Sequence, residues 1–276
     1  MSRNLHKYYY KDYFGEKPEE IIDPEDRQGR RRINASLNWK DIKNDKKNAP
    51  ILKKRNARLT ERGLFYKIEK PVKTDDVFEL GIIYPGLVTG IGINHEATIE
   101  GEFKLGVHFD WTYGMPVVYG SSVKGVLRAW FKEFYKGSRD PYDYEMEIFE
   151  GSLRDIEAEK KKYGQEWEEK VRNVKKRIYS PKSIYDRDVF FDAVLSASDT
   201  KGRILCSDSI TPHGDNPLKN PIPITFLKIA PGCKLEFRFK LVGSEEEKDA
   251  KLNLFREILT SVGIGAKTNV GYGQLK

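Results

Sequence analysis

The stretch that decides the fold runs from Gly114 to Phe131 and reads Gly-Met-Pro-Val-Val-Tyr-Gly-Ser-Ser-Val-Lys-Gly-Val-Leu-Arg-Ala-Trp-Phe. Its pattern predicts a short strand, a sharp glycine turn and the start of a helix. Ser121 or Ser122 can act as the N-cap of that helix, because a serine hydroxyl accepts a hydrogen bond from a free amide of the first turn.

The predicted helix has an apolar face and a basic face. Its apolar residues recur at helical spacing and are Val123, Val126, Leu127, Trp130, Phe131 and Phe134. Lys124, Arg128 and Lys132 follow one another every four residues on the adjoining face. Gly125 leaves room for a close approach to the first turn. Free amides, hydroxyls and two cations together suit a phosphate group. The simpler interpretation is a capped core helix with a solvated basic face.

Composition limits the classes of protein that fit. The 276 residues are enough for one large domain or two small ones, and the formal net charge of +7 suits a polyanionic partner. The two cysteines, Cys206 and Cys233, form no CxxC pattern, which argues against a disulfide scaffold and fits a reducing cytoplasm. No apolar run approaches membrane-spanning length and the N-terminus lacks a signal-peptide core, so no membrane partner is expected.

Residues 1–75 are predicted to form a basic N-terminal extension. Between positions 27 and 62 there are 13 Lys and Arg residues against three Asp and Glu residues. The densest clusters are Arg30, Arg31 and Arg32, and Lys53, Lys54 and Arg55. Such concentrated charge is an electrostatic footprint for nucleic acid; the alternative is a flexible, solvated arm. The aromatic cluster at positions 8–14 is expected to dock on the core rather than meet a partner.

Residues 76–276 alternate between strand and helix signals. Strands are expected within 76–112, at 189–195, 203–207 and 235–241, and after the glycine-rich stretch 263–273, with helices at 120–136 and 245–262. The order strand, helix, strand, strand, helix, strand is the ferredoxin-like (RRM-like) pattern, an α+β fold in which two helices pack on one face of an antiparallel sheet. A charged helical insertion is expected at about 140–180, and a proline-rich excursion at about 198–223.

Common catalytic motifs do not fit. The stretch 120–125 lacks the Lys-Ser/Thr of a P-loop, and the glycines at 263 and 265 do not continue into a dinucleotide fingerprint. Ser121-Ser-Val-Lys124 matches the Ser-x-x-Lys of penicillin-recognising acyl enzymes, but the accompanying Ser-Asp-Asn and Lys-Thr-Gly strings are absent. The four histidines are scattered and form no zinc pattern with the cysteines. No metal or other cofactor is therefore expected.

Two stretches together resemble a known family. Tyr113–Pro116 followed by Gly-Ser-Ser-Val-Lys-Gly-Val-Leu-Arg at 120–128 is similar to the signature after the first strand of the RAMP superfamily of CRISPR proteins. Gly-Ile-Gly-Ala-Lys-Thr-Asn-Val-Gly-Tyr-Gly at 263–273 is similar to the C-terminal glycine-rich loop of that superfamily. The resemblance spans roughly residues 76–276. It is closest to the sixth-subunit family of the type III-B (Cmr) RNA-targeting complexes. Tyr119 departs from that family, which usually has proline there.

The resemblance implies a RAMP fold and a non-catalytic subunit of a helical ribonucleoprotein in antiviral defence. Such a subunit holds the CRISPR guide RNA near its 3′ part and helps to display it to target RNA. Its other partners would be backbone RAMP subunits, a small helical subunit and a 3′-end capping RAMP subunit. The excursion at 198–223 would be the thumb that such subunits wedge into the guide–target duplex.

Phosphate contacts give affinity that does not depend on sequence, which suits a protein that must accept any spacer. The candidate RNA-binding residues are Ser121, Ser122, Lys124, Arg128, Gly263, Gly265, Lys267, Thr268, Asn269, Gly271, Tyr272 and Gly273, together with Arg30, Arg31, Arg32, Lys53, Lys54 and Arg55. Tyr272 can either stack on a base or pack against the protein, and both interpretations stay open.

Three enzymatic alternatives also stay open. RNA-cutting backbone subunits of this superfamily have an aspartate before the Gly-Ser-Ser turn, and the candidate here is Asp110. Its context, directly before Trp-Thr-Tyr, differs from theirs, so no cleavage by this chain is expected. A guide-processing endoribonuclease would use His108 or His95. An acyl enzyme would be labelled at Ser121 by a serine-reactive probe, whereas an RNA-binding protein would not.

Overall fold

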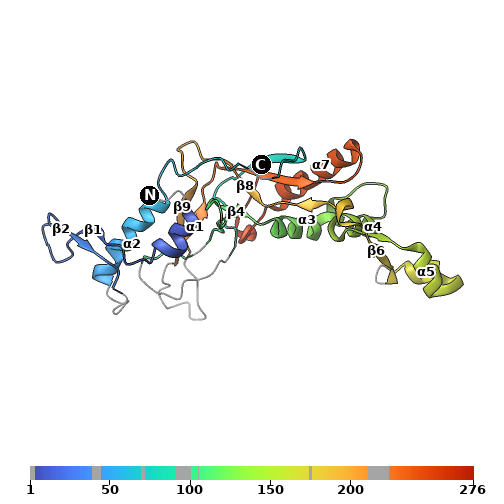
Figure 1. Ribbon diagram of the computed structural model, residues 1–276, viewed down its shortest axis with the longest axis horizontal. Helices are drawn as coiled ribbons and strands as arrows, with labels where there is room; N and C mark the ends of the chain where they lie inside the picture. The colour runs from blue at the N-terminus through green and yellow to red at the C-terminus, as the bar shows by residue number, and fades with distance from the viewer. Residues whose placement is uncertain are drawn as a thin grey trace.

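The computed structural model describes residues 4–38, 45–69, 72–90, 101–104, 106–173, 176–210 and 224–276, with the backbone alone for 45–47. The described part of the molecule is elongated (Figure 1). The hairpin of β1 (Glu19–Ile22) and β2 (Arg32–Ala35) lies at one end, and α5 (Ile156–Tyr163) lies at the other. The central sheet and its two long helices lie between them.

The central sheet has five antiparallel strands. They pair in the order β3–β11–β8–β4, and β7 also pairs with β11. Their bounds are β3 Val77–Gly81, β4 Val117–Val118, β7 Val189–Phe190, β8 Ala193–Ala197 and β11 Lys234–Lys240. The C-terminal residues continue the sheet beyond β3, because the Gly81 amide donates to the Lys276 carbonyl at 2.8 Å and the Ile83 amide to the Gln274 carbonyl at 3.1 Å. The predicted mixed architecture with an antiparallel sheet is confirmed.

Two long helices pack together beside the sheet. They are α3 (Gly120–Phe134) and α7 (Glu245–Val262), and α7 has the predicted bounds. Ser244 caps α7 because its hydroxyl accepts from the Glu247 amide while the Glu247 carboxylate accepts from the Ser244 amide. The prediction that Trp130 faces inward is wrong. Val123, Leu127 and Phe131 form the buried hydrophobic stripe of α3, and Val126 and Phe134 pack partly buried against the core. Trp130 is 45% exposed.

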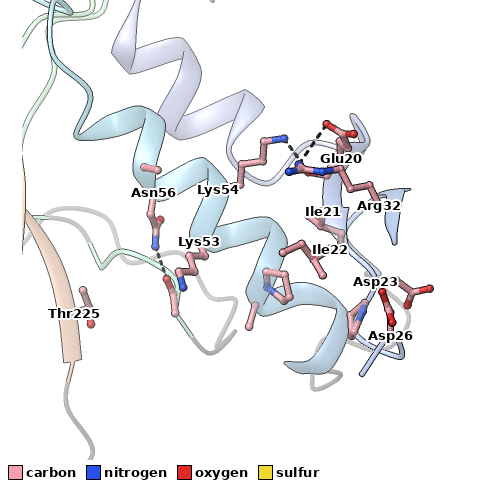
Figure 2. A pocket seen from close by; sticks show the side chains of 15 residues that line it. Glu20, Ile21, Ile22, Asp23, Asp26, Arg32, Lys53, Lys54, Asn56 and Thr225 are labelled. Carbon is pink, nitrogen blue, oxygen red and sulfur yellow. Dashed lines mark hydrogen bonds and ion pairs between the residues drawn. The ribbon is translucent and has the colours of Figure 1, made fainter. Parts of the chain in front are cut away.

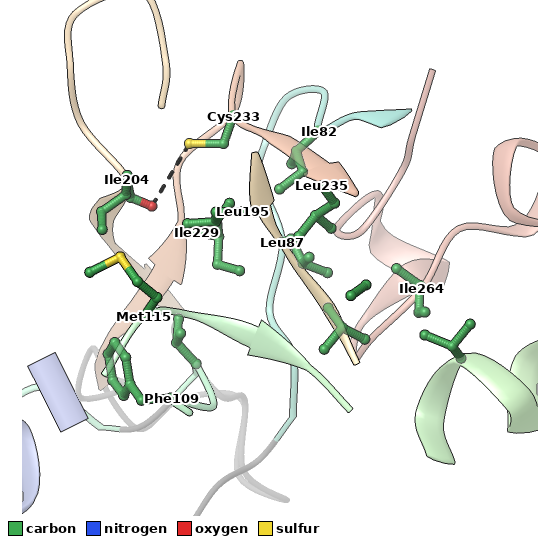
Figure 3. Packing of buried hydrophobic residues seen from close by; sticks show 14 of the residues in the cluster. Ile82, Leu87, Phe109, Met115, Leu195, Ile204, Ile229, Cys233, Leu235 and Ile264 are labelled. Atoms are coloured by element: carbon green, nitrogen blue, oxygen red, sulfur yellow. Dashed lines mark hydrogen bonds between the residues drawn. The ribbon is translucent and has the colours of Figure 1, made fainter. Parts of the chain in front are cut away.

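One hydrophobic core joins the sheet, the helices and the N-terminal segment. The Phe255 ring of α7 lies 5.2 Å from that of Phe239 on β11. Figure 3 shows Leu87, Leu195, Leu235 and Ile264 among the buried side chains of this core. The glycine-rich stretch therefore contributes a fully buried residue, Ile264, to the same core as the central strands.

A second hairpin stands beside the sheet. Its strands are β9 (Leu205–Ile210) and β10 (Ile224–Ile229), and single bridges join Leu87 to Ile229 and Lys104 to Phe226. Strand β9 overlaps the strand predicted at 203–207 and lies in the stretch predicted to form an excursion, whereas β10 follows that stretch. Residues 211–223 of the predicted excursion lie outside the described residues, as does His95.

The stretch predicted as a helical insertion is only partly helical. It contains α4 Pro141–Glu145, η3 Met146–Glu150, β5 Ser152–Arg154, α5, η4 Gly164–Glu166, α6 Trp167–Val171, β6 Tyr179–Pro181 and η6 Ile184–Asp186. The strands β5 and β6 pair in antiparallel fashion and were not predicted. Three residues each are too few to give an alternating hydrophobic signal.

The N-terminal segment is folded over much of its length. It contains α1 Leu5–Lys7, the π-helical turn η1 Tyr8–Asp12, the β1–β2 hairpin and α2 Asp45–Leu59. Tyr8, Tyr9 and Tyr13 are buried, so the early aromatic cluster docks on the core as expected. The Tyr9 hydroxyl donates to the Phe103 carbonyl at 2.7 Å, and the Tyr13 hydroxyl accepts from the Phe103 amide at 3.0 Å. The boundary predicted at residue 75 stays a prediction.

Candidate nucleic-acid interface

A carboxylate from a distant strand connection caps the first turn of α3. Tyr119 is the N-cap residue and its side chain makes no capping hydrogen bond. Instead, the Gly120 amide donates to Asp192 Oδ1 at 2.7 Å. The prediction that Ser121 or Ser122 is the N-cap is wrong, because both lie inside the first turn. Since Asp192 already brings negative charge to the positive end of the helix, this turn attracts phosphate less than predicted.

The basic face of α3 is largely neutralised. Arg128 Nε lies 3.1 Å from Glu145 Oε1, and Arg128 also pairs with Glu150. Lys132 Nζ lies 2.7 Å from Glu145 Oε2. Within the described part of the chain Lys124 forms no ion pair, and it is half-buried. Lys124 is therefore the cation of this face that is available to a ligand.

The glycines of the C-terminal loop allow the backbone to pack closely. A Cβ on Gly265 would lie 2.3 Å from the Val88 carbonyl oxygen, and a Cβ on Gly273 would lie 1.9 Å from that of Ile264. The Ala266 amide donates to the Val88 carbonyl at 2.8 Å and the Gly273 amide to the Gly86 carbonyl at 2.8 Å. Several of the amides predicted to grip phosphate are therefore used within the protein.

Gly263 and Gly271 also have positive φ, at 73° and 93°, so both shape the loop. Between them Lys267 adopts the left-handed conformation with φ 61°, ahead of the single turn η7 (Thr268–Val270). The Lys267 carbonyl accepts from the Val270 and Tyr272 amides, which fixes this turn. The side chains of Lys267 and Asn269 are exposed and Thr268 is half-buried. This turn presents the polar side chains that the loop leaves free for a ligand.

Tyr272 packs against the protein. It is 8% exposed, and its ring centroid lies 5.9 Å from that of Phe226. Its hydroxyl donates to Asp208 Oδ2 at 2.7 Å, and the buried Lys228 ammonium pairs with the same carboxylate. Burial, reinforced by Asp208, raises the pKa of Tyr272. Of the two interpretations left open by the sequence, packing is the one observed.

Arg55 lies inside the protein, which corrects its prediction as a surface contact. Its guanidinium donates to the carbonyls of Gly15 at 3.0 Å and Lys17 at 2.7 Å, and it pairs with Glu19 at 3.6 Å. Burial lowers the pKa of Arg55. The spacing of α2 explains this, because Arg55 shares the buried stripe with Leu52 and Leu59.

Three other basic residues, Arg32, Lys53 and Lys54, line a groove of about 1080 Å³ between the β1–β2 hairpin and α2 (Figure 2). Arg32 pairs with Glu20 at 3.9 Å and Lys54 Nζ donates to the Glu20 carbonyl at 2.8 Å, whereas Lys53 is exposed. Arg30 and Arg31 lie in the hairpin loop, where their amides donate to Asp26. Carboxylates thus alternate with the cations, so this face is less positive than its sequence suggests.

Asp110 and His108 have structural partners. Asp110 Oδ1 accepts from the Thr112 amide at 2.8 Å and the Tyr113 amide at 2.6 Å, which holds the turn that follows. The His108 ring stacks on that of Tyr119 with centroids 5.0 Å apart, and burial lowers the pKa of His108. Among the residues that the structure describes, no three His, Cys, Asp or Glu side chains are grouped as metal ligands would be.

Sequence reasoning missed Asp192, Asp208, Glu145 and Glu150. Each lies 17 or more residues from its partner, and only a defined tertiary contact brings the pairs together. The Asp and Glu residues that follow α3 in the sequence were the only signal that the cations of α3 would form ion pairs. No helix in the described part of the chain is long and apolar enough to cross a membrane.

Comparison with known proteins identifies the class. Residues 82–276 match the model of the RAMP superfamily, and the chain belongs to that superfamily. Among its curated members it is similar to CRISPR system Cmr subunit Cmr6 of Pyrococcus furiosus, with 26% identity over 229 residues, covering 68% of this chain. The match spans 64% of the length of that relative.

Solved structures give more distant similarities. A chain in the type III-B Cmr-beta complex bound to cognate target RNA aligns with a TM-score of 0.48 and 20% identity, over 72% of this chain and 57% of the other. The crystal structure of Cmr6 from Pyrococcus furiosus aligns with a TM-score of 0.35 and 21% identity, over 72% of this chain and 96% of the other.

Proposed function

We propose that this chain is a non-catalytic, RNA-binding subunit of a type III-B CRISPR ribonucleoprotein. It holds the guide RNA near its 3′ part, displays it to target RNA and assembles with other RAMP subunits in the cytoplasm. The observation that carries the proposal is the similarity to Cmr6, and the separate RAMP match over residues 82–276 supports it. In the central sheet, neighbouring positions are taken in turn by the C-terminal segment, β3, β11 and β8. This order supports a ferredoxin-like sheet.

The RNA contact that best fits the geometry combines α3 and the glycine-rich loop. Lys124 and Lys267 are cations without a described ion pair, and Ser121, Thr268 and Asn269 add uncharged hydrogen-bonding groups. Arg128 contributes only by giving up Glu145 and Glu150. Lysine contacts to phosphates position RNA without reading its sequence. Arg30 and Lys53 form a second, separate set of exposed cations on the N-terminal segment.

The absence of nuclease activity in this chain is part of the proposal. A catalytic carboxylate needs free lone pairs directed at a metal, water or substrate. One oxygen of Asp110 is occupied by two amides that hold its own turn. His108 is half-buried and its ring stacks on that of Tyr119. These roles support a binding subunit over a cutting one.

The first measurement is to purify the tagged chain from its native cell, sequence any associated RNA and identify the associated proteins. Short RNAs with a repeat-derived 5′ tag and other RAMP subunits are the expected result. A chain that is recovered without RNA and without RAMP partners contradicts the proposal.

The contact set is tested by replacing both free lysines. Lys124→Ala with Lys267→Ala should lower affinity for a short single-stranded RNA and reduce the slope of log affinity against log salt by about one unit or more. The matched control is Lys161→Ala, an exposed lysine on α5, which should leave both quantities unchanged. An unchanged slope in the double variant would place the contact elsewhere, with the exposed Arg30 and Lys53 as the next candidates.

A further inference from the structure

A row of partly exposed aromatic rings begins where α1 meets the turn at 109–116. Trp111 is in that turn and is 73% exposed. Its ring centroid lies 4.3 Å from that of His6, and the His6 ring lies 4.5 Å from that of Tyr10. Figure 1 shows α1 beside the β4 region in the middle of the molecule. Three rings from two segments thus follow one another, and the outermost is largely uncovered.

A second pair of rings lies at the start of α3. Tyr119, which directly precedes α3, stacks on His108 with centroids 5.0 Å apart and an interplanar angle of 25°. Tyr119 and His108 are both half-buried. The Val117 amide donates to the His108 carbonyl at 2.9 Å, so the turn that bears Trp111 leads directly into the helix that bears Lys124.

The turn that presents Trp111 is held rigidly. Asp110 binds the amides of the next turn residues, the Leu5 amide donates to the Gly114 carbonyl at 3.0 Å, and Asn4 Nδ2 donates to the Thr112 carbonyl at 3.2 Å. Gly114 has φ 70°, and a Cβ there would lie 2.3 Å from Asn4 Oδ1. The exposure of Trp111 is therefore a consequence of fixed backbone geometry rather than of fraying.

We propose that Trp111, His6 and Tyr10 form a stacking platform for unpaired RNA bases, on the turn that leads into the helix bearing Lys124. The inference rests on the proposed RNA-binding function and names a second part of the same interface. Aromatic faces stack on any base, so the platform keeps the independence from sequence that a guide-binding subunit needs.

The test compares ring removal with ring exchange. Trp111→Ala, Trp111→Phe and the control Trp130→Ala are titrated with a fluorescent single-stranded RNA and with an abasic RNA of the same length and charge. Trp130 is the control because it is 45% exposed and contacts no aromatic ring in the described part of the chain. Trp111→Ala should weaken binding of the base-containing RNA about tenfold, the size expected for one lost stack.

Trp111→Ala should leave the salt slope and the affinity for abasic RNA unchanged, and Trp111→Phe should restore most of the affinity. If Trp111→Ala binds the base-containing RNA as tightly as the wild type does, the platform is overturned. The proposed function still stands in that case, because the wild-type chain binds RNA. An equal loss on abasic RNA also overturns the platform. The platform is also overturned if Trp111→Ala binds RNA normally but no longer co-purifies with protein subunits, because the rings would then contact a protein. A wild-type chain without RNA affinity overturns both proposals.

Discussion

Gly265 passes so close to the carbonyl of Val88 that no side chain fits between them. Its φ of 94° is also one that L-residues rarely adopt. Gly125 is the opposite case, because it lies on the outer face of α3 and a Cβ there would meet nothing within 4 Å. The same residue type therefore has a packing role at one position and leaves open space at the other.

This difference predicts opposite effects of alanine. Gly265→Ala should lower the free energy of unfolding by about 2–4 kcal/mol, because it combines backbone strain with a steric clash. Gly125→Ala should raise it by about 0.5–1 kcal/mol, because alanine favours a helix interior. Urea denaturation of both variants gives the comparison. Equal stability of Gly265→Ala and the wild type would mean that the loop does not pack on Val88 in solution.

At the scale of elements, ion pairs join separate segments of the insertion. Arg177 Nη1 lies 2.6 Å from Asp140 Oδ1 and 2.8 Å from Asp143 Oδ1, so it ties the segment before β6 to the start of α4. Asp140 also caps α4 by accepting from the Tyr142 amide at 2.9 Å. The hydrogen bond from Arg177 is the main cause that lowers the pKa of Asp140 to about 2.

A lowered carboxyl pKa makes the insertion sensitive to acid. Ionised Asp140 stabilises the folded state above its unfolded pKa of about 3.9, and this contribution is lost as the pH falls towards 2. Asp140→Asn keeps a capping oxygen but removes the charge. The amides of residues 140–182 should therefore exchange hydrogen faster in this variant than in the wild type at pH 6. The difference in exchange rate should shrink as the pH approaches 2. A difference independent of pH would contradict the role of the charge.

Elements with a strong local pattern could be predicted and those that depend on distant partners could not. Helix α7 has five apolar positions on one face and acidic residues in its first turn, and β11 alternates strictly, so both were found. The start of α3 was found, but its cap was not, because Asp192 is 72 residues away. The β5–β6 hairpin was missed since its strands are short. The carboxylates that pair Arg128 were not foreseen either, and the RNA-binding role of α3 and the glycine-rich loop stays a prediction.

For the whole molecule, the N-terminal segment is part of the core rather than an appended arm. The superfamily match begins at residue 82, yet Tyr9, Tyr13 and Leu52 share one hydrophobic cluster with the central sheet. Charge counting could not reveal this, because Arg55 counts towards a basic surface in the sequence and is 1% exposed in the structure. The guanidinium of Arg55 binds carbonyl oxygens and Glu19, and its aliphatic chain is packed inside the protein. Arg55 is therefore a structural residue.

Loss of Arg55 should therefore destabilise the entire chain. Arg55→Ala is expected to lower the free energy of unfolding by about 3 kcal/mol, since it breaks a buried ion pair. The control Lys53→Ala, on the exposed side of the same helix, should change it by less than about 0.5 kcal/mol. Urea unfolding followed by tryptophan fluorescence and by circular dichroism measures both. A separate early transition in Arg55→Ala would show that the N-terminal segment unfolds independently of the sheet.

The contact between Tyr272 and Asp208 has a consequence for spacing. These residues are 64 positions apart, and the hydroxyl and carboxylate join the loop that presents Lys267 to strand β9. Lys228 closes the same junction from the neighbouring strand. The loop that presents Lys267 and strand β9 are therefore held at a fixed distance from each other. If a long ligand contacts both, the spacing between its two contact points is set by the protein and not by the sequence of the ligand.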